Sequence, residues 1–244
     1  MTDIVITAPV LARSPQEAEM LLRSVEQLAQ HRHVMLADGG SIDGFTERLL
    51  AIPGVTVRTV PGSGPRLVTQ VLQALTMAQA TGCRYVIYTE PDKRWFFENR
   101  LATFLNVAQT NTAAAGIYLS ARDAASFATF PQGQQTTERL FNTLASETLQ
   151  IRADLLYGPL LIRCDLLPCL EDLPPDIGWG WRIFLLTAAH RSGLAIFPWE
   201  ADLPCPPEQQ GEDDERSRTC RIEQMAQNVR GLALGRRKLL RSGD

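Results

Sequence analysis

The sequence lacks a paired-cysteine motif, and this absence excludes two classes of small stabilised protein. Its five cysteines are an odd number and include no C-x-x-C pair. Neither a disulfide framework nor a zinc knuckle is therefore indicated. We expect the thiols to be reduced and structural.

Long apolar runs and an excess of basic residues are also missing. No segment reaches the length of a membrane span, and Met1-Thr2-Asp3-Ile4 leads directly into an apolar run without the basic region of a secretory signal. The formal net charge of −3 gives no general attraction to nucleic acid. These features predict a cytoplasmic protein with no integral membrane segment and no nucleic-acid partner.

What the chain does contain is a regular alternation of strand and helix signals over about its first 90 residues. The expected strands cover residues 3–8, 33–37, 55–60 and 85–88. The expected helices cover residues 14–29, 45–51 and 66–81. This alternation is typical of an α/β fold with a mostly parallel sheet flanked by helices, whose ligands bind beyond the carboxyl ends of the strands.

The second expected strand ends on an acidic, glycine-rich turn, Asp38-Gly39-Gly40-Ser41-Ile42-Asp43-Gly44. A carboxylate at a strand end can accept hydrogen bonds from a base or ribose, and glycines let a ligand approach the backbone. The alternative is a structural turn in which Asp43 caps the next helix.

A second glycine-rich segment, Gly62-Ser63-Gly64-Pro65-Arg66, precedes the third expected helix. Main-chain N–H groups at a helix N-terminus, together with a cation, favour phosphate. The segment has neither the lysine and spacing of a P-loop nor the full dinucleotide fingerprint. An ordinary loop is the competing interpretation.

The fourth strand stops abruptly on Glu90-Pro91-Asp92-Lys93. Pro91 disfavours the α region for Glu90, and if the extension persists then Glu90 and Asp92 point the same way. Two adjacent carboxylates repel unless a cation lies between them, so the pair indicates a hard metal ion. In the competing interpretation Asp92 caps the next helix and Glu90 pairs with Lys93 or Arg94.

The order of these features resembles that of the GT-A fold nucleotide-sugar glycosyltransferases. Further segments resemble the glucosyl-3-phosphoglycerate synthase branch of that superfamily, and they are Tyr157-Gly158-Pro159-Leu160, Leu173-Pro174-Pro175, Gly178-Trp179-Gly180-Trp181-Arg182, Glu200-Ala201-Asp202-Leu203 and Gln224-Met225-Ala226-Gln227-Asn228-Val229. The resemblance implies one GT-A-like, Rossmann-like domain over residues 1–244. Residues 1–120 would form the nucleotide-binding half, and residues 121–244 the acceptor-binding half with a C-terminal helix.

The resemblance also implies roles for residues around the nucleotide sugar. Ala8 and Pro9 would lie in the loop after the first strand, beside the nucleotide. Asp38 would contact the base, while Gly64 and Arg66 would contact the nucleotide sugar or its phosphates.

Glu90 and Asp92 would occupy the place of the Asp-x-Asp metal motif of such enzymes. They would hold Mn²⁺ or Mg²⁺, with Glu90 also touching the nucleotide sugar. The metal would bridge the diphosphate and stabilise the leaving nucleoside diphosphate, and Lys93 would assist as a second positive charge.

Two positions depart from the pattern of the related enzymes. Arg182 stands where they have a glutamate, and Cys205-Pro206-Pro207-Glu208 stands where they have a metal-binding histidine. Glu208 is our candidate third metal ligand, with Asp202 as the alternative. Asp176 is our candidate catalytic carboxylate, with Glu171 or Asp172 as alternatives.

The sequence therefore predicts a metal-dependent glycosyltransferase that moves a sugar from a nucleoside diphosphate to a small-molecule or lipid-linked acceptor. A sugar-phosphate nucleotidyltransferase and a catalytically degenerate binding or scaffold protein are the alternatives. The identity of the acceptor and the formation of a homo-oligomer are left open.

Overall fold

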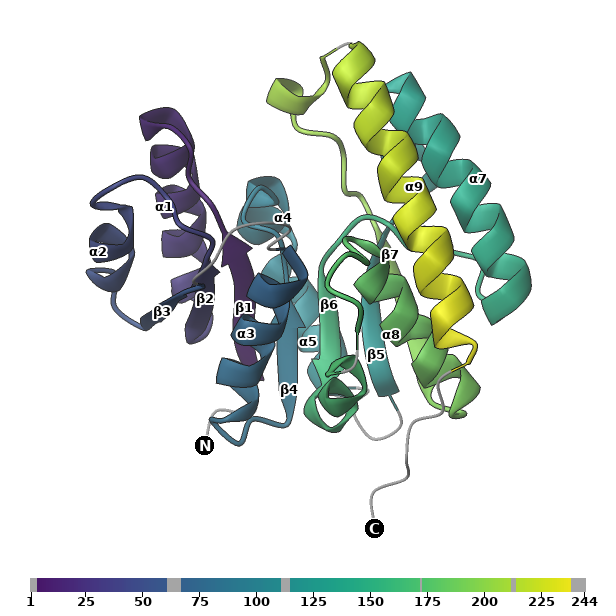
Figure 1. Cartoon of the computed structure of the whole chain (residues 1–244), viewed down its shortest axis with the longest axis horizontal. Coiled ribbons are helices and arrows are strands. Elements are labelled where there is room, and N and C mark those ends of the chain that lie inside the picture. The colour runs from purple at the N-terminus through teal and green to yellow at the C-terminus, as the bar shows by residue number, and fades with distance from the viewer. Residues whose placement is uncertain (1–3, 61–66, 111–114, 172, 212–213, 238–244) are drawn as a thin grey trace. The chain divides into compact units, whose positions relative to one another are not determined.

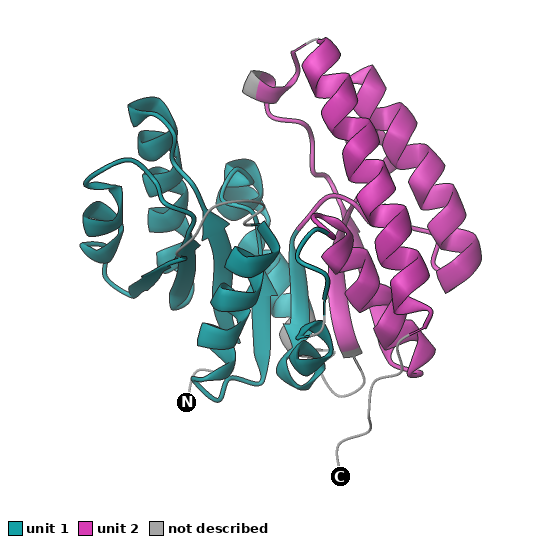
Figure 2. Ribbon diagram, in the orientation of Figure 1, with its two compact units in different colours: residues 1–112, 159–176 teal, residues 113–158, 177–244 magenta. Residues whose placement is uncertain are grey.

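The computed structural model describes residues 4–60, 67–110, 115–171, 173–211 and 214–237 (Figure 1). The chain forms two compact units. Unit 1 comprises residues 1–112 and 159–176, and unit 2 comprises residues 113–158 and 177–244 (Figure 2). Residues 159–176 thus return to unit 1 after the chain has entered unit 2. The functional division into halves 1–120 and 121–244, and the single-domain organisation, stay predictions.

Five strands of unit 1 lie in the order β3-β2-β1-β4-β6. Their bounds are β1 Ile4–Val10, β2 Val34–Asp38, β3 Val55–Thr59, β4 Tyr85–Tyr88 and β6 Leu160–Arg163. The first four strands run parallel, and β6 is antiparallel to β4. Every residue of β1, β2 and β4 is buried, which explains why these strands are continuous apolar runs.

Helices cover this part of the sheet. Their bounds are α1 Pro15–Ala29, α2 Phe45–Leu50, α3 Leu67–Gln79, α4 Arg94–Asn99, α5 Leu101–Thr110 and the 3₁₀ helix η1 Cys164–Leu170. Helix α3 packs against β1, β2 and β4 and lies in front of them in Figure 1. The predicted mostly parallel α/β architecture is confirmed in this unit.

Two helix predictions had different outcomes. Helix α1 begins as predicted, because Ser14 Oγ accepts a hydrogen bond from the N–H of Glu17 at 3.2 Å and Pro15 occupies the first turn. After β4 the sequence predicts a single helix over residues 95–109, and this prediction is wrong. The segment is divided into α4 and α5 at Arg100, whose φ of −131° leaves the helical region.

Unit 2 contains the parallel strands β5 Ala115–Arg122 and β7 Ala195–Ala201. Its helices are α6 Ala124–Phe127, α7 Gln132–Leu149, α8 Gly180–Arg191, the 3₁₀ helix η2 Pro207–Gln209 and α9 Glu215–Gly235. Helix α8 packs against β5 and β7 as well as against α9. Residues 180–189 are therefore all buried, as expected for a helix covered on every side.

Glycines allow α8 and α9 to approach at backbone distance. A Cβ atom placed on Gly231 would lie 2.1 Å from the carbonyl oxygen of Gly180, and one on Gly180 would lie 2.1 Å from the carbonyl oxygen of Gln227. Near the end of α9, a Cβ atom on Gly235 would lie 2.6 Å from Thr187 Cβ. The crossing therefore requires residues without a side chain.

We expect Gly231→Ala to lower the free energy of unfolding by about 2 kcal/mol, because overpacking against main chain exceeds the gain of about 1 kcal/mol from helix propensity. Urea denaturation measures the change. Gly211→Ala is the matched control, since nothing lies within 4 Å of its added Cβ. Equal stabilities of the two variants would contradict the close crossing.

A buried ion-pair cluster ties the carboxyl end of β5 to α7. Arg122 Nε donates to Asp154 Oδ2 at 2.5 Å and its Nη2 donates to Asp154 Oδ1 at 3.0 Å and to Glu138. Burial alone would lower the pKa of Arg122, but the charges of Asp154 and Glu138 outweigh it and raise that pKa. The guanidinium also lies 4.7 Å from the ring centroid of Phe127 and 4.3 Å from that of Phe130.

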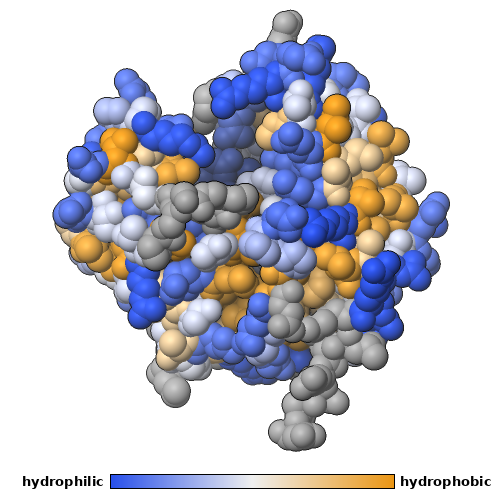
Figure 3. Space-filling view, in the orientation of Figure 1, coloured by the Kyte–Doolittle hydropathy of each residue, from blue (hydrophilic) through white to orange (hydrophobic). Residues whose placement is uncertain are grey.

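The surface of unit 2 mixes polar and apolar side chains over α7 and α9 (Figure 3). The large exposed hydrophobic residues on these two helices are Leu140, Leu144, Ile222 and Val229. Helices in the described part of the chain are all too short or too polar to cross a membrane. All five cysteines are free thiols in this structure, four of them buried and Cys220 exposed.

Candidate functional site

The carboxyl ends of the parallel strands of unit 1 lie at one edge of the sheet. Val10 is level with Asp38 at the ends of β1 and β2, and Thr7 is level with Tyr88 at the end of β4. We call the Asp38 turn, the loop of residues 11–14 and the turn of residues 90–93 the strand-end site. Open α/β sheets bind their ligands at such an edge.

Asp38 lies at the last position of β2, as predicted, and its side chain is buried. Its Oδ1 accepts hydrogen bonds from the N–H and Oγ of Ser41 at 3.1 and 2.5 Å, and its Oδ2 accepts from Thr46 Oγ1 at 2.9 Å. Ser41 Oγ in turn accepts from the N–H of Ala12 at 2.8 Å. Asp38 therefore fixes the turn of residues 39–44 and connects it to the loop after β1. The alternative role for Asp43 is wrong, because α2 has no side-chain cap.

Gln70 is a residue of this edge that the sequence did not reveal. Its buried amide donates to the carbonyl oxygens of Val10 at 2.9 Å and Ala37 at 3.1 Å. It thereby joins the ends of β1 and β2. A Cβ atom on Gly39 would lie 2.7 Å from Gln70 Nε2, so glycine leaves room for this amide. The one available sequence signal was a polar residue within the apolar face of a helix.

Ala8 and Pro9 lie inside β1, so their predicted placement in the loop after the first strand is wrong. Thr7 faces β4, since its carbonyl oxygen accepts from the N–H of Thr89 at 3.0 Å. Position 9 faces the same way, and proline has no N–H to donate. Pairing of β1 with β4 accordingly stops at Thr7, and the loop beside the ligand edge is residues 11–14.

The chain turns directly after β4 instead of staying extended. The N–H of Lys93 donates to the carbonyl oxygen of Glu90 at 3.2 Å, which closes a four-residue turn. The expectation that extended backbone aligns Glu90 and Asp92 is therefore wrong. Pro91 fits the turn because its fixed φ suits the second position.

Asp92 does not cap the helix that follows, so the competing interpretation of this residue is also wrong. The N-cap of α4 is Lys93, and no side chain caps it. Lys93 Nζ lies 3.0 Å from Asp92 Oδ2, and Arg94 Nε lies 2.6 Å from Glu98 Oε1. Asp92 thus pairs with Lys93 through its Oδ2 and does not cap α4.

The donor atoms at this turn suit a hard cation. Glu90 is buried, and Asp92 Oδ1 is a buried carboxylate oxygen that accepts no hydrogen bond. Mg²⁺ and similar ions are held by one or two carboxylates together with substrate phosphates. Three His, Cys, Asp or Glu side chains do not converge on one point anywhere in the described residues. Glu90 and Asp92 therefore supply donor types that would hold such a metal together with the phosphates of a ligand.

The described structure does not test the placement of the remaining predicted residues at this edge. Gly64 and Arg66 lie outside the described residues. Asp176 is exposed in the turn before α8. Glu208 contributes its backbone to η2, and its side chain is outside the described part. Arg182 is buried in α8. The roles of Asp176 and Glu208 stay predictions.

Solved structures of glucosyl-3-phosphoglycerate synthase from Mycobacterium tuberculosis share the fold of the chain. The complex with Mn²⁺, UDP-glucose and phosphoglyceric acid has a TM-score of 0.60 and 16% identity, with 96% of this chain and 80% of that chain covered. The complex with Mn²⁺, UDP and phosphoglyceric acid has a TM-score of 0.60 and 18% identity, with 99% and 81% covered. The complex with Mg²⁺ and UDP has a TM-score of 0.62 and 16% identity, with 96% and 80% covered.

No protein-family model and no curated protein sequence matches the chain. The structural likeness nevertheless extends over nearly all of it. The predicted GT-A, Rossmann-like fold is therefore confirmed. At 16–18% identity the likeness establishes the fold alone.

Proposed function

We propose that the chain is a glycosyltransferase that uses a nucleoside diphosphate sugar as donor. The observation that carries this proposal is the turn after β4, where Glu90 and the unbonded Oδ1 of Asp92 lie at the carboxyl end of a buried parallel strand. The fold it shares with an enzyme crystallised with UDP-glucose supports the same assignment.

Different residues of the strand-end site would bind different parts of the nucleotide sugar. The turn held by Asp38 and Ser41 shapes the edge beside which the base and ribose would lie, and its glycines allow close approach of the ligand. Glu90 and Asp92 would hold Mn²⁺ or Mg²⁺, and such an ion supplies Lewis-acid stabilisation of the departing diphosphate. Lys93 keeps a positive charge beside Asp92, where it would also offset negative charge on the phosphates.

We propose a donor from the ligands of the similar structures and an acceptor class from the sequence. The related structures contain UDP or UDP-glucose, so a uridine diphosphate sugar is the first donor to test. For the acceptor we retain a small-molecule or lipid-linked group. Asp176 is proposed as the carboxylate that acts near the acceptor, and Glu208 as a further metal ligand.

Calorimetric titration with UDP tests the donor site. We expect binding that is at least tenfold tighter, or about 1.4 kcal/mol more favourable, with Mn²⁺ than with EDTA, because an ion held by Glu90 and Asp92 would attract the diphosphate. GDP, CDP and ADP serve as competing ligands that define the base. Failure of all four diphosphates to bind, with or without metal, would overturn the proposal.

Turnover distinguishes an enzyme from a degenerate binding protein with the same fold. Release of UDP from UDP-glucose, even as slow hydrolysis without acceptor, supports the enzyme. Metal-dependent UDP binding with no sugar released from any donor or acceptor would favour the binding protein. Arg182, where the resembled enzymes have a glutamate, makes this comparison necessary.

A further inference from the structure

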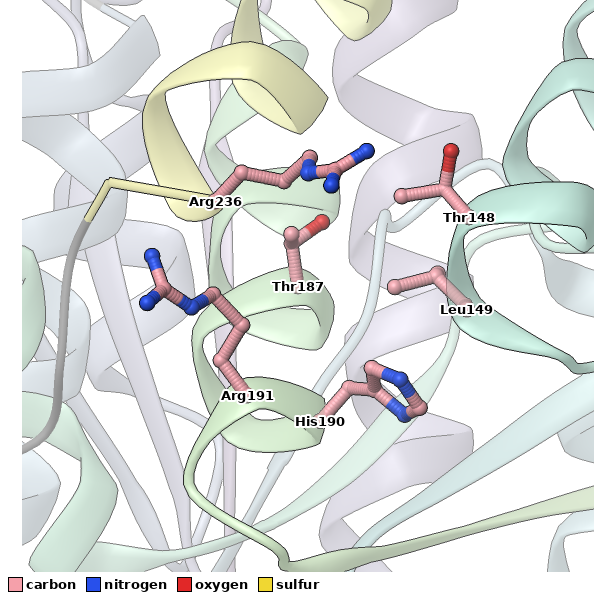
Figure 4. Close-up of a pocket in the computed structure, with 6 residues that line it drawn as sticks. All are labelled: Thr148, Leu149, Thr187, His190, Arg191 and Arg236. Carbon is pink, nitrogen blue, oxygen red and sulfur yellow. The ribbon is translucent and has the colours of Figure 1, made fainter.

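A cavity of about 500 Å³ opens where three helices of unit 2 end. It is lined by Thr148, Leu149, Thr187, His190, Arg191 and Arg236 (Figure 4). Thr148 and Leu149 come from the last turn of α7, Arg191 is the last residue of α8, and Arg236 is the C-cap of α9. Figure 4 shows Arg236 directed across the opening toward Thr148. We call this space the helix-end cavity.

The helix-end cavity is cationic and polar. Two of its six lining residues are arginines, one is a histidine, two carry hydroxyl groups and none is acidic. Neither Arg191 nor Arg236 forms an ion pair within the described residues. A small anion is therefore the class of ligand that such a lining complements, since guanidinium groups pair strongly and in fixed geometry with phosphate oxygens.

The cations are not needed to complete the hydrogen bonds of the helix ends. Main-chain N–H groups of residues 192–194 donate to the carbonyl oxygens of Ala189 and His190 at 3.0–3.1 Å. At the end of α9 the N–H of Arg237 donates to the carbonyl oxygen of Leu234 at 3.0 Å. The carbonyl groups of Ala188, Ala189 and His190 in α8, and those of Leu232 and Leu234 in α9, are thus bonded by the main chain and do not need the guanidinium groups as donors.

The helix-end cavity lies at the opposite end of β5 and β7 from their carboxyl ends, where α/β sheets bind ligands. Helix α8 ends at Arg191, and β7 begins at Ala195, so the cavity lies by the amino end of β7. The carboxyl ends of β5 and β7, at Arg122 and Ala201, are at the opposite end of the strand pair. A ligand of the helix-end cavity is therefore distinct from any ligand at the strand ends of unit 2.

We propose that the helix-end cavity binds a phosphate-bearing small molecule through Arg191 and Arg236. The hydroxyl group of Thr148 already donates to the carbonyl oxygen of Leu144 at 3.2 Å, so it offers a lone pair to a hydroxyl group of the same ligand. A volume of about 500 Å³ exceeds the need of a bare phosphate and suits a phosphorylated metabolite. This site is independent of the proposed transferase activity.

Calorimetric titration with inorganic pyrophosphate in EDTA tests the site. Saturable binding to the wild-type chain is expected to weaken at least about tenfold in Arg191→Gln/Arg236→Gln, because two charge-assisted contacts are lost. Arg218→Gln, at the other end of α9, removes the same kind of charge and is expected to change binding less than about twofold.

Labelling of arginines with phenylglyoxal, read by mass spectrometry, locates the bound anion without a variant. Pyrophosphate is expected to slow labelling of Arg191 and Arg236 at least about threefold and to leave Arg218 unchanged, because a bound anion covers the guanidinium groups. Absence of saturable binding, or equal binding by the double variant and wild type, would overturn the proposal. So would labelling rates of Arg191 and Arg236 that are the same with and without pyrophosphate. Pyrophosphate bound only at the strand-end site would give equal binding by the two proteins and unchanged labelling rates. If the double variant does not fold, the labelling decides.

Discussion

Replacing Glu90 by Gln and Asp92 by Asn together is expected to lower kcat for sugar transfer or UDP-glucose hydrolysis at least about 100-fold, equivalent to about 2.7 kcal/mol of transition-state stabilisation. Both amides keep the shape of the side chains and remove the negative charges that hold a divalent cation. The turn itself depends on the main-chain bond from Lys93 to Glu90, so it is expected to persist. Steady-state kinetics over a range of Mn²⁺ concentrations measure the effect.

Glu98→Gln is the matched control for this pair. Glu98 lies on α4 a few residues away, pairs with Arg94 near the surface and has no proposed role in metal binding. Its kcat is expected to stay within about twofold of wild type, as for a change away from the reacting atoms. A double Glu90/Asp92 variant with unchanged kcat and unchanged response to Mn²⁺ would contradict the assignment of the strand-end site.

Replacing Arg122 by Met is expected to lower the free energy of unfolding by about 3–5 kcal/mol, because removal of one partner leaves buried carboxylates uncompensated. Asp154 and Glu138 both contact this guanidinium, and its side chain is only 1% exposed. For a chain of this size the loss corresponds to a fall in Tm of about 10 °C. Chemical denaturation and differential scanning calorimetry measure the two quantities.

Arg48→Met provides the comparison, since Arg48 pairs with Glu19 at 2.7 Å but both side chains are about half exposed. Surface pairs of this kind contribute about 0–1 kcal/mol. Adding Asp154→Leu to Arg122→Met is expected to recover part of the lost stability, because it removes a buried charge. Equal stabilities of Arg122→Met and Arg48→Met would show that the cluster is not held as described.

The sequence was sufficient for features that depend on local periodicity and capping. The strand–helix alternation of unit 1, the start of α1 at Ser14 and Pro15, and the placement of Asp38 at a strand end were all predicted. Each of these depends on residues within a few positions of one another. The order of these features along the chain also carries the family resemblance from which the GT-A fold was predicted.

Features that depend on distant residues were not accessible in this way. Gln70 joins two strands 60 and 33 positions away through main-chain oxygens, and nothing in its own helix specifies those partners. The contact of Arg122 with Asp154 spans 32 positions. The turn at Glu90 was missed because Pro91 restricts the residue before it but leaves the following backbone free to turn. Tertiary packing decides the first two contacts, whereas the turn is closed locally by the bond from Lys93 to Glu90.

The order of the strands in unit 1 places Pro9 at a special point of the sheet. From β1 the chain builds outward through β2 to β3 on one side, and it then crosses to β4 on the other. The topological switch point of the sheet therefore lies between the carboxyl ends of β1 and β4, because the connections from these two strands lead in opposite directions. Sheets of this kind form a ligand-binding crevice at that point. Because proline has no N–H group to donate, the β1–β4 ladder ends at Thr7, and the tips of the two strands are not hydrogen-bonded to each other at the switch point where the proposed diphosphate would bind.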